Sequence, residues 1–178
     1  MRVDGQAQKA ARRPEPAPVE APPECDCPQL EFDDWHEVES DWSDIQFLKA
    51  SLPALGGVPI GFAGARQKLL AEAGKLGLTV PDSPMVLLGE GRLRRPVLLE
   101  VESAAPNARV VQPGGVAWSR IVSAHFGDMK RLAAETGASA RARYGRDPGA
   151  LWVWYLTCAV CSEARNWETM FVAHYASL

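Results

Sequence analysis

The residues with the clearest capacity for chemistry are four cysteines, which form two close pairs near opposite ends of the chain. Cys158 and Cys161 have the Cys-x-x-Cys spacing of a zinc knuckle or a redox dithiol, and Cys25 and Cys27 offer two further thiols. Four thiolates would complete a tetrahedral structural zinc site with metal–sulfur bonds of about 2.3 Å. A disulfide or dithiol relay and four unligated thiols are the alternatives. No helical pattern begins after Cys161, which disfavours a thioredoxin-like site.

Histidine is scarce, and its placement favours no common catalytic metal site. His36, His125 and His174 form no His-x-x-x-His or Glu-x-x-His pattern. His125 precedes a predicted helix near Asp128, so it is a candidate general base, with a surface or capping role as the alternative. The sequence also has no Gly-x-Ser-x-Gly elbow and no phosphate-binding Gly-Lys-Ser/Thr loop, which argues against an α/β-type serine hydrolase and a P-loop enzyme.

Two tryptophans near the end of the chain are candidates for contacting a ligand. Trp152 and Trp154 lie two residues apart in a predicted strand, so both indoles project from one face. On the next predicted strand a second set shares one face: Glu168, Met170, Val172 and His174. Indoles beside a carboxylate would suit a planar or cationic molecule. Trp118, on an earlier strand, is a weaker candidate for the same cleft. Ordinary core or sheet-covering side chains are the alternative.

The elements that must position these residues occur twice in the same order. The first copy consists of a strand, a helix and two strands, at residues 45–52, 62–76, 85–88 and 97–101. The second copy has the same elements at residues 116–122, 126–140, 151–157 and 169–175. We therefore expect an α+β fold, built by pseudo-twofold duplication of a strand–helix–strand–strand unit (about 45–102 and 115–175). Its antiparallel sheet should carry the helices on one face.

The two segments before the repeated units differ from those units in composition. Within residues 1–24, five prolines at positions 14, 16, 18, 22 and 23 lie among alanine, glutamate and valine, which predicts a disordered Pro-rich tail. Residues 25–44 contain no Lys or Arg but eight acidic residues, with Phe32, Trp35 and Trp42 among them. We expect these aromatic side chains to pin an irregular lead-in to the domain. An acidic–aromatic segment that binds a partner is the alternative.

Composition and charge exclude several classes of protein. The chain has 178 residues, 47% of them hydrophobic, and a net charge of −3, so one domain with a real core is expected. Clustered Lys and Arg, which nucleic-acid binding requires, are missing. No apolar run approaches the ~20 residues of a membrane span, and the start of the chain has no secretory h-region. We expect a cytoplasmic protein that binds neither nucleic acid nor membrane; its oligomeric state is left open.

Three stretches resemble the GyrI-like small-molecule-binding domain, and most closely a bacterial branch of it often labelled hydrolase. These are Cys25-Asp26-Cys27-Pro28 with the acidic segment behind it, Val58-Pro59-Ile60-Gly61-Phe62, and the run Trp152–Cys161. The resemblance covers residues 25–178 and implies two modules with a ligand cleft between them. It also implies a cleft glutamate on the last strand, for which Glu168 is the nearest match. Residues 123–126, Ser-Ala-His-Phe, depart from the acidic-Gly-Pro-aromatic run of that branch.

Three functions follow as expectations. The first is binding of a small aromatic or cationic molecule in a cleft between the two modules, with Trp152, Trp154, Met170 and His174 as lining residues. The second is a hydrolase in which a cleft carboxylate such as Glu168 activates water. The third is a structural or partner-binding protein organised by the cysteine cluster.

Overall fold

The computed structural model describes residues 25–102 and 107–176. The predicted Pro-rich tail, residues 1–24, lies outside them. The helices are α1 (Phe32–Trp35), α2 (Ala65–Lys75) and α3 (Met129–Tyr144), and short 3-10 turns η1 (Phe62–Gly64) and η2 (Phe126–Asp128) lead into the last two. The strands are β1 (Val38–Asp41), β2 (Gln46–Leu55), β3 (Val58–Pro59), β4 (Val86–Leu88), β5 (Arg94–Val101), β6 (Val110–Val111), β7 (Val116–Ser123), β8 (Ala150–Tyr155) and β9 (Glu168–Tyr175).

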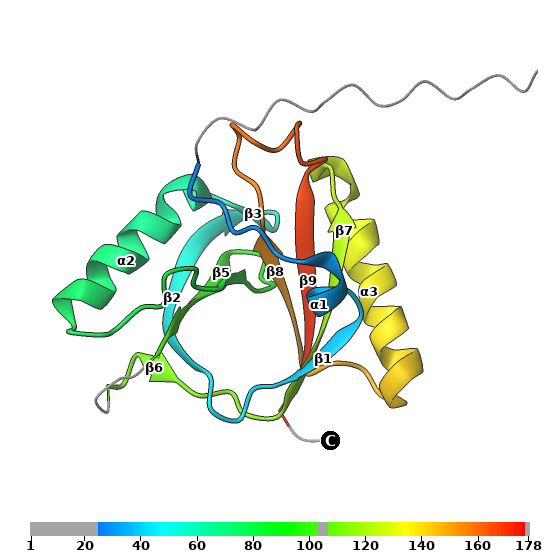
Figure 1. Ribbon diagram of the computed structural model, residues 1–178, viewed down its shortest axis with the longest axis horizontal. Coiled ribbons are helices and arrows are strands. Elements are labelled where there is room, and N and C mark those ends of the chain that lie inside the picture. The colour runs from blue at the N-terminus through cyan, green and yellow to red at the C-terminus, as the bar shows by residue number, and fades with distance from the viewer. Residues whose placement is uncertain (1–24, 103–106, 177–178) are drawn as a thin grey trace, which may run out of the picture.

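The described strands form one curled antiparallel sheet (Figure 1). Its order is β1-β7-β9-β8-β4-β5-β2-β3, and β6 pairs with β2. The groups β7-β9-β8 and β4-β5-β2 meet in the middle, where β4 and β8 share the pair Leu88–Val153. In each group the strand nearest the middle is the one that follows a helix: β8 follows α3, and β4 follows α2. The α+β fold with an antiparallel sheet is thus confirmed, whereas a twofold relation between the groups stays a prediction.

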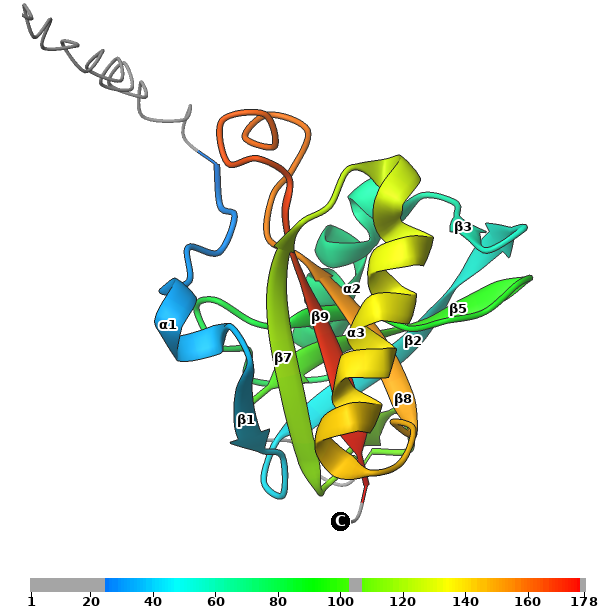
Figure 2. The same ribbon diagram turned by 90° about the vertical axis from the view of Figure 1, so that its right-hand side faces the viewer.

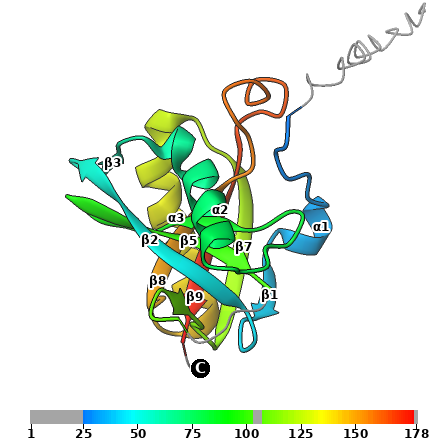
Figure 3. The same ribbon diagram turned by 90° about the vertical axis from the view of Figure 1, so that its left-hand side faces the viewer.

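Both longer helices cover the same side of the sheet, which we call the outer face. Leu69 and Ala73 of α2 pack with Leu48 and Leu99, while Leu132 of α3 packs with Phe171. Figure 2 shows α3 on the outside of the curl, and Figure 3 shows α2 on the outside of its other end. The two predicted helices thus lie on one face, whereas Trp35 of α1 packs on the opposite face. None of the described helices is long and apolar enough to cross a membrane.

The opposite, inner face carries a second core that the lead-in completes. Side chains at alternate positions of six strands meet there with Trp42: Phe47, Met85, Leu87, Leu98, Ala117, Ile121, Trp154, Leu156, Met170 and Val172. Leu30 and Trp35 of the lead-in, and Ile45 directly after it, pack against this cluster. Trp35 and Trp42 therefore pin the lead-in as expected, whereas Phe32 is exposed and stacks on His36.

The lead-in contributes structure that its composition did not predict. Val38–Asp41 forms the edge strand β1, which pairs with β7 from Val38–Ser119 to Asp41–Val116. Ser119 is buried, and its hydroxyl donates to the backbone oxygen of Trp35 at 2.6 Å. In Figure 1 this segment crosses the open side of the curled sheet. A sheet edge formed from an acidic segment depends on partners distant in the sequence, so local pattern does not reveal it.

Candidate functional site

Five predicted ligand-contacting residues fall into two groups on the sheet. Trp154 and Met170 form a cross-strand pair within the inner-face cluster, and Trp152 packs against that cluster. His174 follows Met170 and Val172 at the alternating positions of β9. Trp118 instead packs with Ala140 of α3 on the outer face. The structure therefore brings four of these residues to one face and places Trp118 on the other.

The two indoles of the aromatic strand have different environments. Trp154 is only 3% exposed, and Trp35 of the lead-in meets it edge to face with ring centroids 6.0 Å apart. Trp152 is partly exposed and lies over Gly89, where an added Cβ would come within 2.7 Å of the indole and 2.6 Å of Pro96. Among the described residues, Trp152 Nε1 is buried and has no hydrogen-bond partner. Trp154 thus belongs to the core, whereas Trp152 combines a partly exposed residue with a buried donor that has no partner among the described residues.

His174 is held in place by contacts with the protein. Its Nε2–H donates to the Gly114 carbonyl at 2.7 Å, which fixes the tautomer, and its ring stacks on Trp42 at 5.2 Å. Because only 7% of the residue is exposed, its contacts are those of the core.

Glu168 occupies the inner-face side of β9 but is engaged by a neighbouring guanidinium. Arg165 contacts Glu168 Oε2 through Nε at 3.1 Å and through its terminal nitrogen at 2.6 Å. The same Arg165 side chain, 13% exposed, also donates to the carbonyl groups of Leu156 and Pro28, each at 2.9 Å. Glu168 therefore belongs to a group of polar contacts, centred on Arg165, that joins the β8–β9 turn to the lead-in. Sequence analysis missed Arg165, because its partner Pro28 is 137 residues away.

His125 lies at the beginning of η2 and is exposed. Its ring lies 3.9 Å from that of Trp167, and the backbone of Trp167 has a positive φ of 49°. Such a conformation is uncommon for a bulky residue and marks a constrained turn. No described hydrogen bond or ion pair joins His125 to Glu168, so these two predicted catalytic groups do not form an acid–base pair here.

A second carboxylate on the inner face escaped the sequence analysis. Glu100 pairs with Phe47 on β2 and alternates with Leu98, so it faces the inner cluster. Its Oε2 accepts the Met85 N–H at 2.9 Å, and burial, partly offset by that hydrogen bond, raises the pKa of the carboxyl group. A single acidic residue inside the apolar run Val97–Val101 was the available signal.

The raised pKa of Glu100 predicts a pH-dependent stability. The folded state holds the Glu100 proton more tightly than the unfolded state, whose pKa is about 4.3. Protonated Glu100 therefore stabilises the folded state at pH values below the unfolded-state pKa. This stabilisation is lost as pH rises through the higher folded-state pKa. Glu100→Gln keeps an acceptor for Met85 but cannot ionise. Urea unfolding from pH 4 to 7 should show the variant gaining stability relative to wild type as pH rises. Parallel curves would contradict the assignment.

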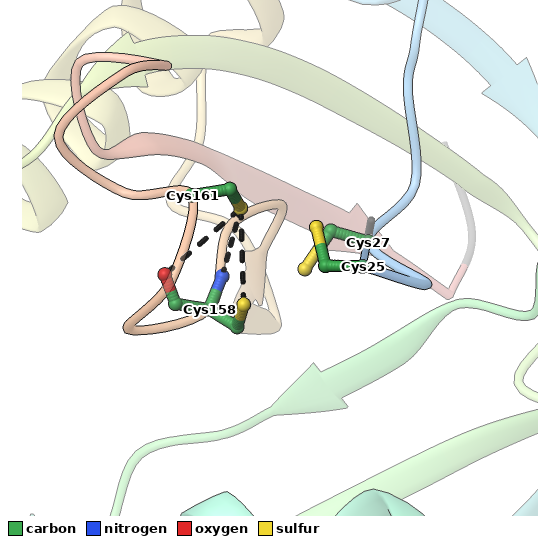
Figure 4. Close-up of side chains that lie close together, drawn as sticks. All are labelled: Cys25, Cys27, Cys158 and Cys161. Atoms are coloured by element: carbon green, nitrogen blue, oxygen red, sulfur yellow. Dashed lines mark hydrogen bonds between the residues drawn. The ribbon is translucent and has the colours of Figure 1, made fainter. Parts of the chain in front are cut away.

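All four cysteines converge at the end of the sheet beside Glu168. Their sulfur atoms lie within 4.8 Å of one another, and those of Cys158 and Cys161 are 3.9 Å apart. Figure 4 shows Cys25 and Cys27, on the lead-in, with their sulfurs directed towards Cys158 and Cys161 on the β8–β9 turn. Cys161 is buried and the other three are partly buried. The predicted four-cysteine cluster is thus confirmed as a set of side chains that could hold a metal ion.

The thiols of this cluster have unequal acidities. The backbone N–H groups of Cys161 and Val160 favour the thiolate form and lower the pKa of Cys158 to about 7. Burial raises the pKa of Cys27 and, less strongly, that of Cys161. A buried thiolate needs a compensating positive charge, which a bound metal ion supplies.

A family model described as Bacterial hydrolase matches residues 18–175. No curated protein matches the chain. The matched range includes the cysteine cluster, the aromatic strand and both carboxylates of the inner face. This chain belongs to the Bacterial hydrolase family.

Proposed function

We propose that this protein binds a small planar molecule, aromatic or cationic, on the inner face of its curled sheet, with Trp152 as the main contact. The supporting observation is the state of Trp152: the ring is partly exposed, and its buried Nε1 has no partner among the described residues. A ligand acceptor atom would satisfy this donor, while the ring would stack on a planar group. Trp154, Met170 and His174 form the packed surroundings of this site.

The arrangement of the sheet supports the same proposal. Gly89 and Pro96 lie beneath and beside the Trp152 indole, so its ring is held in a fixed orientation. Glu100 places a carboxyl group on the same face with no arginine paired to it among the described residues, which favours a cationic ligand. The mirrored strand groups that meet between β4 and β8 are what a GyrI-like duplication with a central ligand site would produce.

Binding is tested with two planar probes of opposite charge, proflavine and anthracene-9-carboxylate. We expect proflavine to bind the wild-type chain and Trp152→Ala to weaken binding about five- to thirtyfold, the ~1–2 kcal/mol of a partly desolvated cation–π contact. Phe126→Ala, at a residue that is 70% exposed in the turn leading into α3, is the matched control. Isothermal titration gives the affinities. Equal affinity of wild type and Trp152→Ala, or no binding of either probe, would refute the proposal.

Hydrolysis of the bound molecule is the second candidate, and membership of a family described as Bacterial hydrolase favours it. Glu100 is the better placed general base, because burial raises its pKa towards neutral pH and no arginine pairs with it in the described residues. Glu168, the residue predicted from the sequence, would act only after release from Arg165.

Turnover is tested by incubating the protein with a panel of aromatic esters and epoxides and following the gain of one water by mass spectrometry. We expect Glu100→Gln to abolish turnover while proflavine still binds, and Glu168→Gln to retain most of it. The reverse result would assign the base to Glu168. Turnover that survives in both variants would exclude these carboxylates.

A further inference from the structure

We propose that Cys25, Cys27, Cys158 and Cys161 form a tetrathiolate zinc site that fastens the lead-in to the turn between β8 and β9. The inference does not depend on the inner-face ligand, because the cysteines lie beyond the end of the strands. The two cysteine pairs are separated by more than 130 residues, yet their four sulfurs lie within 4.8 Å of one another.

The distances suit a tetrahedral ion. Four sulfurs bonded to zinc at about 2.3 Å are about 3.8 Å apart in a regular tetrahedron. Cys158 and Cys161 already have this separation, 3.9 Å, and the widest pair in the cluster exceeds it by only about an ångström. A disulfide would require about 2.05 Å between two sulfurs. The arrangement is therefore four sulfurs around one centre rather than two bonded pairs.

The backbone of the turn is also arranged for a thiolate. The Cys158 N–H donates to the Cys161 sulfur at 3.4 Å, so the turn folds back and brings its second cysteine over its first. The Ser162 N–H donates to the Cys158 carbonyl at 3.0 Å, which closes the turn. The Cys158 amide thus stabilises negative charge at the Cys161 sulfur.

The ligand set selects the metal class. Four thiolates with no histidine or carboxylate among them are soft donors, which favour zinc over magnesium, calcium or manganese. Four protein ligands also fill a tetrahedral ion and leave no open position, so the site is structural rather than catalytic.

The site would fasten a segment that has little structure of its own. Residues 25–31 form no helix or strand, and Pro28 is bound to the turn through Arg165 at 2.9 Å. Beyond Pro28, Leu30 and Trp35 cover the inner-face cluster, and Trp35 meets Trp154. Zinc would therefore hold the cover of the inner face at its N-terminal end, and removal of the zinc would expose the Trp154 side of that core.

The proposal is tested on the full chain purified under reducing conditions. Elemental analysis should find one zinc per chain, and cobalt(II) added to the metal-free protein should produce thiolate-to-cobalt charge-transfer bands with the intense visible bands of tetrahedral coordination. Cys27→Ser and Cys161→Ser should each weaken zinc binding by more than the ~10- to 100-fold loss that follows removal of an outer-shell partner. Arg165→Ala, which removes the Pro28 contact, should fall within that range.

Ser162→Ala is the control within the same turn, because the Ser162 side chain has no hydrogen bond among the described residues; it should bind zinc as wild type does. Circular dichroism of each variant separates loss of metal from loss of fold. Zinc content far below one per chain after reconstitution with zinc alone would overturn the proposal. So would full zinc affinity in Cys27→Ser, or tetrahedral cobalt bands that persist in that variant.

Discussion

Trp154→Ala should destabilise the protein by about 3 to 5 kcal/mol, as expected for removing a buried tryptophan from a core. Trp154 is 3% exposed and lies between the sheet cluster and Trp35, so the cavity would open where the lead-in covers the inner face. Urea unfolding followed by far-UV circular dichroism measures the change. Because Trp152 is partly exposed, Trp152→Ala should lower the free energy of unfolding clearly less than Trp154→Ala does.

The control for this prediction is Phe126→Ala, at a residue that is 70% exposed, and it should change stability by no more than ~0.5 kcal/mol. Trp35→Ala combined with Trp154→Ala gives a double-mutant cycle, and the edge-to-face pair should couple by about 0.5 to 1.5 kcal/mol. A loss below about 1.5 kcal/mol for Trp154→Ala would mean that this indole is not part of a packed core. Trp154 would then return as a candidate ligand contact.

Gly115→Ala should be the most damaging of the glycine substitutions beside the lead-in, at about 3 kcal/mol or more, the sum of left-handed backbone strain and an overpacked contact. Gly115 has a φ of +69°, and an added Cβ would lie 2.0 Å from the Tyr175 backbone oxygen. The Gly115 carbonyl also accepts the Trp42 N–H at 2.8 Å. The clash therefore falls where β7, β9 and the lead-in meet.

Gly114→Ala is the matched comparison. Gly114 has nearly the same backbone conformation, with a φ of +63°, but nothing lies within 4 Å of a Cβ added there. Only the left-handed strain remains, so a loss of about 1 kcal/mol is expected. Chemical denaturation of both variants gives the difference. If the two substitutions cost the same, the close approach of the Gly115 and Tyr175 backbones is not present in solution.

The candidate site was only partly predictable. The spacing of Trp152 and Trp154 correctly indicates a shared face, because side chains alternate along any strand. It could not indicate that Trp154 lies under Trp35 while Trp152 stays partly exposed, since the cover comes from a segment more than 100 residues earlier. In the same way, Glu168 was readable as a carboxylate near the last strand, but its pairing with Arg165 depends on how the intervening turn folds.

The sequence alone determined the two longer helices and the main strands of this protein. Apolar periodicity located α2, α3 and the main strands, because a helix and a strand each repeat their buried positions at a fixed interval. The tertiary structure decided the rest: which sheet face each strand presents to the helices, the pairing of β1 with β7, and the meeting of four cysteines from both ends of the chain. These depend on contacts between residues far apart in sequence, and local spacing carries no information about them.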